Sequence, residues 1–384
     1  MKKERFLFVV YYMLIYMTNS VYGAYIYIYY KSIGLSLFQI GVLSAIGPVF
    51  SILVQPLWSV LCDRAKYRTT VLKIILIGSL LSMLLYQRMS SFSDICVVTV
   101  VYMLFSTAIF PISDSISVEA MKKCGFNFST IRMGGTIGYV VVVVLAGYYF
   151  KSHLNRLFQI NAVLLLLCLI AVCLMKKENS GAKRADRTVY LPILKNRKLI
   201  FVLFFIMMLS VALSFDWSFL GLRINELHYS NDFIGYASGL ASLTEIPVLA
   251  MMPRCYKKFG IVNIILFAGF MLSARLIICF FATDIVMILA SQLLQGFTYM
   301  TVHYSTINYI NDNLPHNAKS FGQSLLAISQ SGFGSMIGTF GGGCLSSAVG
   351  ISPAFGIIGF SLLAISAVCI AGKRFNLFGC KRAG

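Results

Sequence analysis

The chain has 384 residues, of which 58% are hydrophobic and 12% are charged, and its mean hydropathy is +0.82. No water-soluble globular domain of ordinary composition is this apolar, so the composition predicts a protein that crosses a membrane several times. The net charge of +19 does not indicate nucleic-acid binding, because the basic residues fall between long apolar runs and not on an amphipathic face.

Apolar stretches of membrane-spanning length predict about twelve transmembrane helices. The first apolar run continues from Phe6 to about Tyr30, which is too long for a signal peptide, so we expect it to be kept as a membrane helix. The predicted spans begin near Phe6, Phe38, Thr70, Ile95, Ser129, Leu157, Leu199, Phe233, Val262, Ile285, Ser320 and Ile351.

A basic, polar stretch divides these spans into two halves. We predict an N-terminal six-helix bundle over residues 1–175, a cytoplasmic linker over 176–198 and a C-terminal six-helix bundle over 199–384. The second and eighth spans resemble each other weakly: both open with Ile-Gly, contain a proline and end in a basic loop. Internal repetition around a linker is typical of transporters built from two bundles.

The basic residues also predict the orientation of the chain. With the N-terminus inside, most Lys and Arg residues fall in the cytoplasmic connections, and the opposite side holds Lys31, Arg88, Lys151, Arg156 and Arg223. This positive-inside bias places both termini in the cytoplasm. We therefore predict an all-α, multi-pass protein of the cell membrane, here a bacterial plasma membrane, that contacts the lipid bilayer and acts as a monomer.

Three charges interrupt the fourth and fifth predicted spans. Asp114, Glu119 and Arg132 lie in apolar surroundings, where each charge costs roughly 3 kcal/mol or more. If the two helices turn near Gly125 and Phe126, Glu119 and Arg132 lie at similar depth and Asp114 about 7.5 Å deeper. Glu119 and Arg132 form either a structural ion pair or a pair that grips substrate hydroxyls; Asp114 is either a proton carrier or a hydrogen-bonded carboxyl group.

The second half holds further ionisable residues in apolar segments. If the eighth and ninth spans are antiparallel helices that turn near Lys258, the membrane depths of Glu245 and Arg275 differ by no more than about 5 Å. They form either a fixed pair or one that breaks when a proton or substrate arrives. Asp216 and His303 are further candidates for proton coupling, although a lone histidine is more often a hydrogen-bonded packing residue.

The spacing of other residues predicts a wall of the binding site and close helix contacts. Tyr12, Tyr16, Asn19 and Gly23 share one face of the first span, which suits a polar ligand with flat apolar faces but also suits simple packing. Glycines four residues apart predict close packing between helices. They are Gly134 and Gly138 in the fifth span, and Gly334, Gly338 and Gly342 in the eleventh.

Segments along almost the whole chain resemble the major facilitator superfamily, and within it the branch of lactose permease and the oligosaccharide:proton symporters. QPLWSVLCDRAKYR, residues 55–68, is similar to the loop signature between the second and third helices, and VEA with FSTIRMGGTIGY, residues 118–120 and 128–139, is similar to the sugar-binding segment. The resemblance implies that Glu119 and Arg132 bind sugar, with Tyr139 in place of a stacking Trp.

The resemblance also implies a conformational latch. Asp63, together with Arg64 and Arg68 of the same loop, is set against the start of the eleventh helix at Ser320. The exposed N–H groups of a helix start favour an anion.

The sequence departs from the family pattern where the proton is handled. The tenth helix of the permease carries a His and a Glu, and this chain has Gln295 and Thr298 at those places. The eighth-helix Glu of the permease corresponds to Ser242, with Glu245 about one turn further along. Proton coupling therefore has to come from other carboxyl groups, of which Asp114 and Glu245 are the first candidates.

These patterns predict a secondary transporter that carries a small polar solute, such as a sugar or glycoside, with protons and by alternating access. The sequence has no G-x-x-x-x-G-K-[ST] loop that would supply ATP, and its ten cysteines occur singly, so we predict no cofactor and no metal. The alternatives are a proton-driven exporter of hydrophobic or aromatic compounds, a membrane-embedded transferase and a sensor. Short loops and tails disfavour the last two, so we do not expect an enzyme.

Overall fold

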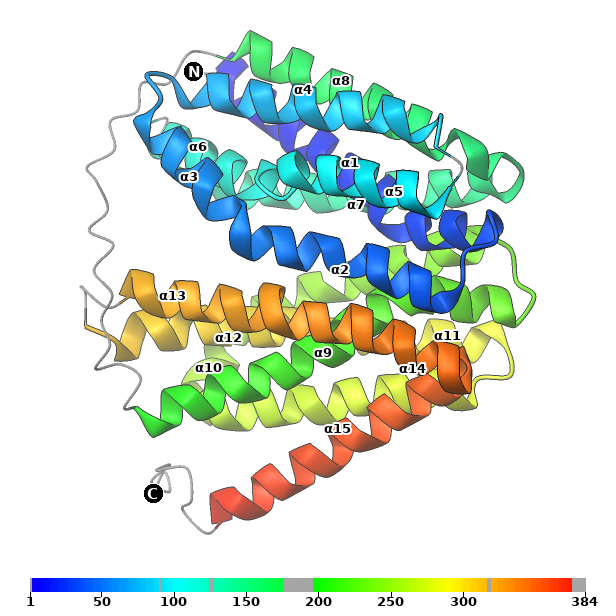
Figure 1. Cartoon of the computed structure of the whole chain (residues 1–384). Helices are drawn as coiled ribbons and strands as arrows, with labels where there is room; N and C mark the ends of the chain where they lie inside the picture. Colours follow the sequence, from blue (N-terminus) through cyan, green and yellow to red (C-terminus); the bar gives the residue numbers. More distant parts are fainter. Residues whose placement is uncertain (1, 90, 124–127, 176–195, 316–318, 375–384) are drawn as a thin grey trace. The chain divides into compact units, whose positions relative to one another are not determined.

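The computed structural model describes residues 2–89, 91–123, 128–175, 196–315 and 319–374 (Figure 1). Within these ranges every regular element is a helix, so the predicted all-α class is confirmed. Most of the predicted linker, residues 176–195, lies outside the described residues, as does the predicted turn at Gly125 and Phe126.

Nine helical stretches of the described chain are long and apolar enough to cross a membrane. Two of them exceed a single crossing: Ile131–Leu174 has 44 residues and Asp232–Phe281 has 50. Fifty helical residues extend about 75 Å, more than twice the hydrocarbon thickness, and the longer stretch is broken at Gly260, where φ is +69°. Both stretches therefore contain more than one membrane-spanning segment.

The helices form two compact units. Unit 1 comprises Met1–Ala185 and Ser230–Gly239, and unit 2 comprises Asp186–Tyr229 and Leu240–Gly384. Unit 1 contains α1 (Lys2–Ser32), α2 (Leu37–Leu53), α3 (Gln55–Arg64), α4 (Arg68–Tyr86), α5 (Phe92–Ser106), α6 (Ile109–Lys123), α7 (Phe128–His153), the short 3₁₀ helix η1 (Leu154–Arg156) and α8 (Leu157–Leu174). Unit 2 contains α9 (Arg197–Glu226), most of α10 (Asp232–Phe281), α11 (Ile285–Gln292), α12 (Gln295–Asn313), α13 (Lys319–Ala327), the π-helical segments η4 (Ile328–Gly334) and η5 (Ile337–Gly341), α14 (Gly342–Val349) and α15 (Ile351–Arg374).

Local sequence signals start several of these helices. Four helices begin after a residue whose side chain accepts a hydrogen bond from a backbone N–H of the first turn. These N-cap residues are Ser36 before α2, Ser91 before α5, Asn196 before α9 and Asp284 before α11. The first of these is a full capping box, because the side chain of Gln39 accepts from the backbone N–H of Ser36 in return. These caps satisfy N–H groups that the helix itself leaves without a partner.

In unit 1, α1 packs against both α7 and α8, and α4 packs against α5 and α8 (Figure 1). Glycines permit the close approach of α1 to α7. A Cβ atom at Gly138 would lie 3.0 Å from the carbonyl oxygen of Met13, and one at Gly134 would lie 3.1 Å from Val9. The predicted packing role of Gly134 and Gly138 is therefore confirmed.

The first turns of α10 belong to unit 1 and lie against the end of α7. The side chain of Asn231 donates to the carbonyl oxygen of Phe150 at 3.0 Å, and Lys151 lies 3.9 Å from Asp232. A Cβ atom at Gly235 would lie 2.6 Å from the carbonyl oxygen of Val143. Lys151, a cation expected only as a topology signal, thus also forms an ion pair.

In unit 2, α9 packs against the π-helical segments η4 and η5 and against α15. The row of Gly334, Gly338 and Gly342 faces α9, and a Cβ atom at any of them would overlap α9. The Cβ atom at Gly334 would meet Ser210 and Met207, the one at Gly338 would meet Val211, and the one at Gly342 would meet Phe215. The predicted packing role of this second glycine row is also confirmed.

Arg223 near the end of α9 is buried, although the sequence predicted only a topology signal. Its guanidinium donates to the carbonyl oxygens of Cys279 at 3.1 Å and Ala282 at 2.7 Å, and it pairs with Glu226 at 2.8 Å. The two carbonyl groups lie at the end of α10, where a helix has no N–H partners for them. Arg223 therefore closes this helix end.

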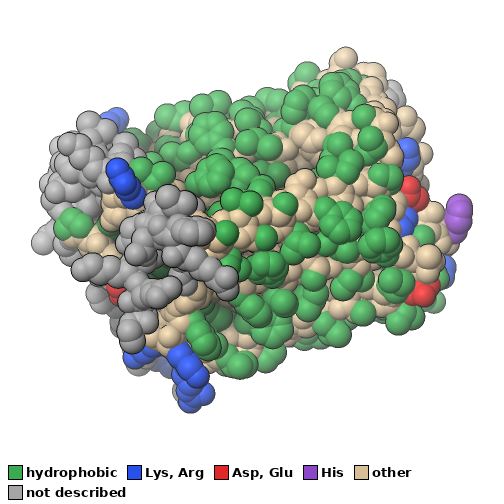
Figure 2. Space-filling model, turned by 90° about the horizontal axis from the view of Figure 1, so that it is seen from below, with side chains coloured by type: hydrophobic (Ala, Val, Ile, Leu, Met, Phe, Trp, Pro, Cys, Tyr) green, Lys and Arg blue, Asp and Glu red, His purple; other side chains and the backbone are tan. Residues whose placement is uncertain are grey.

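The outer surface is that of a membrane protein. On the face shown in Figure 2, hydrophobic side chains are spread over the middle, Lys and Arg side chains lie near both ends, and a histidine side chain lies at one end. Large exposed hydrophobic side chains are frequent among the described residues, for example Leu145, Tyr148 and Val368. Such a broad apolar surface is stable in contact with lipid hydrocarbon and not with water.

We expect Gly338→Ala to lower the thermal stability of the detergent-solubilised protein, because its Cβ atom would overlap the backbone of Val211. Overpacking of this kind costs about 1–3 kcal/mol. Gly341→Ala is the matched control in the same π-helical segment, since the nearest atom to its new Cβ lies 4.0 Å away. Equal melting temperatures of the two variants in scanning fluorimetry would contradict the packing role.

Candidate functional site

Asp114 on α6 is the central polar residue of unit 1. The hydroxyl group of Tyr12 on α1 donates to its Oδ1 atom at 2.6 Å. Ser113, the neighbouring residue, shares a 2.6 Å hydrogen bond with Tyr11. Arg132 on α7 is the positive charge that acts on Asp114. Three helices that are separate in the sequence therefore supply a carboxylate, a phenol and a guanidinium to one region.

The other predicted wall residues lie on the same helices. Tyr16 is half-buried on α1, with its ring edge-on to Phe110 at 5.2 Å between centroids. Asn19 is exposed although it lies within the apolar span of α1, and Tyr139 is half-buried on α7. Hydrocarbon offers an exposed amide no hydrogen bonds, so Asn19 stays a candidate for a solute contact.

Glu119 accepts a hydrogen bond from Arg68, a partner that the sequence did not indicate. The Nη1 atom of Arg68 lies 2.8 Å from Glu119 and 3.4 Å from the hydroxyl group of Ser115. The same guanidinium lies 3.7 Å from Asp63, whose side chain is half-exposed. Arg68, the first residue of α4, is buried and joins the end of α3 to α6, so it connects the predicted latch to the predicted substrate residue.

The corresponding region of unit 2 contains a fully buried ion pair. The Oδ2 atom of Asp216 on α9 lies 2.7 Å from an Nη atom of Arg275 on α10. The exposed fractions are 0% for Asp216 and 1% for Arg275. Within the described part of the chain neither carboxylate oxygen has a hydrogen bond, so this charge depends on Arg275 alone.

Glutamine side chains complete the coordination of Arg275. Its guanidinium donates to Gln292 at 2.6 Å and also to Gln295. The amide nitrogen of Gln295 in turn donates to Glu245 at 3.4 Å. The predicted approach of Glu245 to Arg275 is therefore indirect, with Gln295 between them. The residue that replaces the family's histidine thus connects two predicted coupling residues.

An aromatic row lies beside this network on α9 and α12. Trp217 is 56% exposed and its ring lies 6.0 Å from that of Tyr299, which stacks on His303 at 5.8 Å between centroids. His303 is half-buried, as expected for a packing residue or a ligand contact. Trp217 and Tyr299 were not predicted as site residues, because an aromatic residue in an apolar span carries no sequence signal that separates packing from binding.

Each unit has a broken helix beside its polar cluster. In unit 1, α5 ends at Ser106 and α6 begins at Ile109, and the carbonyl group of Leu104 before this break accepts from the indole of Trp58 at 2.7 Å. In unit 2, α11 ends at Gln292 and α12 begins at Gln295. Discontinuous helices at membrane depth are tolerated where they are buried in protein or line a cavity, and they often mark binding sites of transporters.

Apolar helices in two units, with ionisable and aromatic side chains grouped next to helix breaks, are typical of membrane transporters. The model of the MFS_1 like family matches residues 7–357. The chain therefore belongs to the MFS_1 like family of major facilitator transporters, which are multi-pass proteins of the cell membrane and not enzymes.

Proteins that are similar to this chain in sequence are also named as transporters. The transporter YwbF of Bacillus subtilis (strain 168) is 23% identical over 333 residues, which cover 85% of this chain and 82% of the relative. The maltose permease of Geobacillus stearothermophilus is 23% identical over 309 residues, which cover 80% and 78%. The crystal structure of the nucleoside transporter NupG has a TM-score of 0.84 at 12% identity over 95% of this chain and 98% of that one. The likeness to NupG shows the shared fold.

We expect Asp216→Asn to destabilise the protein strongly, because it leaves the charge of Arg275 buried without its counter-ion. Breaking a buried pair in this way costs about 3–5 kcal/mol. The double variant Asp216→Asn with Arg275→Gln removes both charges and should recover much of the lost thermal stability in scanning fluorimetry. A double variant that is no more stable than Asp216→Asn alone would show that the pair does not hold these helices together.

Proposed function

We propose that the protein imports a small polar solute, a sugar or a glycoside, together with protons by alternating access. In this proposal about twelve helices span the membrane and both termini are cytoplasmic. The observation that carries it is the grouping of Asp114, Tyr12 and Arg132 within apolar helices, where ionisable groups are costly and mark substrate or proton pathways. The similarity to a maltose permease supports a sugar as the solute.

The proposed substrate contacts in unit 1 are Arg132, Glu119, Tyr139, Tyr16 and Asn19. A guanidinium presents a planar fork of donors and a carboxylate presents acceptors, so Arg132 and Glu119 together suit the adjacent hydroxyl groups of a sugar. Arg68 lies 2.8 Å from Glu119 and holds its carboxylate in place. Aromatic rings offer flat apolar faces to the C–H side of a sugar ring, and the exposed amide of Asn19 offers both a donor and an acceptor.

In unit 2, Trp217 and Tyr299 form an aromatic surface that could also contact a solute. Trp217 is more than half exposed, and its neighbour in the sequence, Asp216, is fully buried. Its position next to the ion pair of Asp216 and Arg275 would bring a bound solute close to a charge network.

The proposed coupling residues are Asp114 in unit 1 and the network of Asp216, Arg275 and Glu245, with His303 beside it. A carboxyl group can exchange its proton only if its charge state changes during the cycle. Asp114 accepts a hydrogen bond from Tyr12, and the charge of Arg132 acts on it, so substrate binding at Arg132 would change the electrostatic environment of Asp114. Coupling then follows from competition for one positive charge.

Uptake into proteoliposomes tests the proposed function. A panel of sugars, glycosides, nucleosides and aromatic acids is offered with and without an imposed pH gradient. We expect a sugar or glycoside to accumulate only when the solution on the non-cytoplasmic side of the protein is the more acidic one. We also expect protons to cross the membrane when that solute is present. Flux of hydrophobic compounds in the direction opposite to proton flow would instead identify an exporter. The absence of any flux that depends on the pH gradient would contradict symport.

Two substitutions separate substrate binding from proton coupling. Asp114→Asn should abolish accumulation driven by the pH gradient but retain exchange of labelled for unlabelled solute. Arg132→Lys, which keeps the charge and loses the planar fork, should lower both activities by at least about tenfold. Tyr148→Phe is the control, since Tyr148 is 74% exposed on α7 and should leave both activities unchanged. Normal exchange by Arg132→Lys would exclude the bidentate contact.

We further propose that Asp63, Arg64 and Arg68 form a conformational latch. Asp63→Asn removes the charge that lies 3.7 Å from Arg68 and leaves the bond from Arg68 to Glu119 in place. We expect a lower turnover number with little change in the equilibrium affinity for solute, as measured by uptake rates and by binding in detergent. Unchanged turnover would count against the latch.

A further inference from the structure

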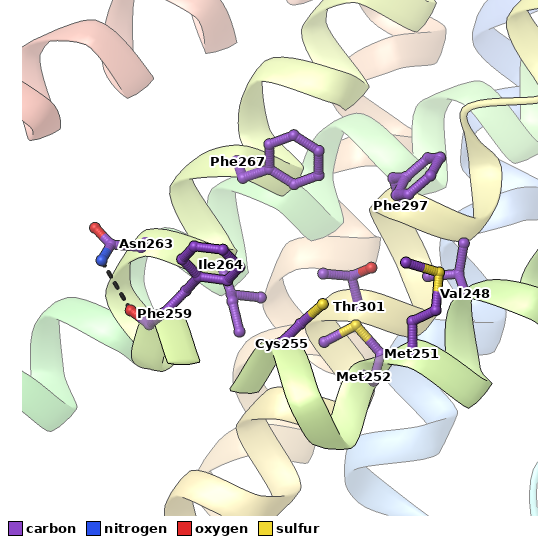
Figure 3. A pocket seen from close by; sticks show the side chains of 10 residues that line it. All are labelled: Val248, Met251, Met252, Cys255, Phe259, Asn263, Ile264, Phe267, Phe297 and Thr301. Atoms are coloured by element: carbon purple, nitrogen blue, oxygen red, sulfur yellow. Dashed lines mark hydrogen bonds between the residues drawn. The ribbon is translucent and has the colours of Figure 1, made fainter. Parts of the chain in front are cut away.

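An apolar cavity of about 410 Å³ lies in unit 2, and its lining residues are different from those of the polar cluster described above (Figure 3). It is lined by both halves of α10 and by α12. Its volume falls within the roughly 300–1,000 Å³ of typical ligand pockets. Val248, Met252 and Ile264 form a buried cluster on one side of it, and Met251 and Phe259 are more than half exposed on the other. The cavity is therefore open on the side of Met251 and Phe259.

The two polar residues of the lining are already satisfied within the protein. The side-chain nitrogen of Asn263 donates to the carbonyl oxygen of Phe259 at 2.8 Å, and the hydroxyl group of Thr301 donates to the carbonyl oxygen of Gly296 at 3.1 Å. The remaining lining is Val, Ile, Met, Cys and Phe. The cavity thus offers contacts to a hydrocarbon chain and little that would orient a sugar. Methionine side chains adapt to flexible apolar ligands.

The two ends of the cavity differ in charge. Phe267 and Phe297 pack edge-on at 6.0 Å and close one end, as Figure 3 shows. Phe259 lies at the other end, and the break at Gly260 separates it from Phe267 in the sequence. The ammonium group of Lys258 lies 5.3 Å from the centre of the Phe259 ring, so a cation stands beside this end.

Lys258 is one of three cations in the two turns before Gly260. Arg254, Lys257 and Lys258 are all exposed, and no acidic residue occurs in the sequence between Glu245 and Asp284. Arg254 follows Met251 by three residues and Lys258 follows Cys255 by three, so both cations share a helix face with lining residues. This arrangement places positive charge at one end of the apolar cavity.

We propose that this cavity binds an anionic phospholipid, with an acyl chain along the cavity and the phosphate group beside Arg254, Lys257 and Lys258. The charge at one end and the hydrocarbon lining over the rest match the two parts of such a lipid. Basic pockets between transmembrane helices on the cytoplasmic side bind anionic head groups. The site is separate from the proposed solute contacts and does not depend on the proposed transport function.

Native mass spectrometry of the detergent-solubilised protein tests the site with phosphatidylglycerol and phosphatidylcholine of identical acyl chains. We expect tighter binding of phosphatidylglycerol. The triple variant Arg254→Gln, Lys257→Gln and Lys258→Gln should weaken phosphatidylglycerol binding by on the order of tenfold or more and leave phosphatidylcholine binding unchanged. Met251→Trp, which fills the cavity from its exposed side, should weaken the binding of both lipids.

Two control variants make the comparison specific. Lys31→Gln, Arg88→Gln and Arg156→Gln remove the same charge from exposed positions elsewhere, and Ile357→Trp adds an indole at an exposed apolar position on α15. Both should bind phosphatidylglycerol like the unmodified protein. Equal affinity for the two lipids, or equal loss in the basic triple variant and its control, would overturn the proposal. Loss in Met251→Trp alone would identify a general apolar pocket and overturn it as well.

Discussion

A guanidinium buried among apolar helices has to be neutralised where it lies, because it keeps its proton at any accessible pH. This chain uses three solutions. Arg275 pairs with a fully buried aspartate and two glutamines, Arg223 closes the carbonyl end of a helix, and Arg68 joins two carboxylates from different helices. Each arginine ties together segments that are distant in the sequence, so the need for neutralisation determines much of how the helices of each unit are held.

The same requirement separates rigid from adaptable parts of the protein. Glycine rows bring α7 onto α1 and the π-helical segments onto α9 at distances that leave no room for a Cβ atom. The polar clusters lie instead beside helix breaks, where α5 meets α6 and α11 meets α12. Arg275 there has an aspartate and two glutamines within reach, and a proton or solute that removes one contact changes the balance among the others. A transporter needs such alternatives at its site and fixed contacts around it.

The opposite faces of α12 show how one helix serves two environments. Tyr299 and His303 lie on the face with the aromatic row, whereas Phe297 and Thr301 line the apolar cavity. Residues two apart on a helix point away from each other, so α12 can contact a polar solute on one face and a lipid chain on the other. The cavity contacts both halves of α10, and its occupant would lie next to the helix that carries Glu245.

The sequence by itself determined the membrane-spanning class, the all-helical fold, the glycine contacts and the ionisable residues, because these follow from composition and helical spacing. The distance of a residue from a turn predicts its depth, which is why Glu245 was placed near Arg275. Depth does not fix rotation about the helix axis or the packing of distant helices. Only the tertiary structure decided that Asp216 pairs with Arg275, that Arg68 holds Glu119 and that Trp217 meets Tyr299. Each of these contacts joins helices whose relative rotation no local pattern records.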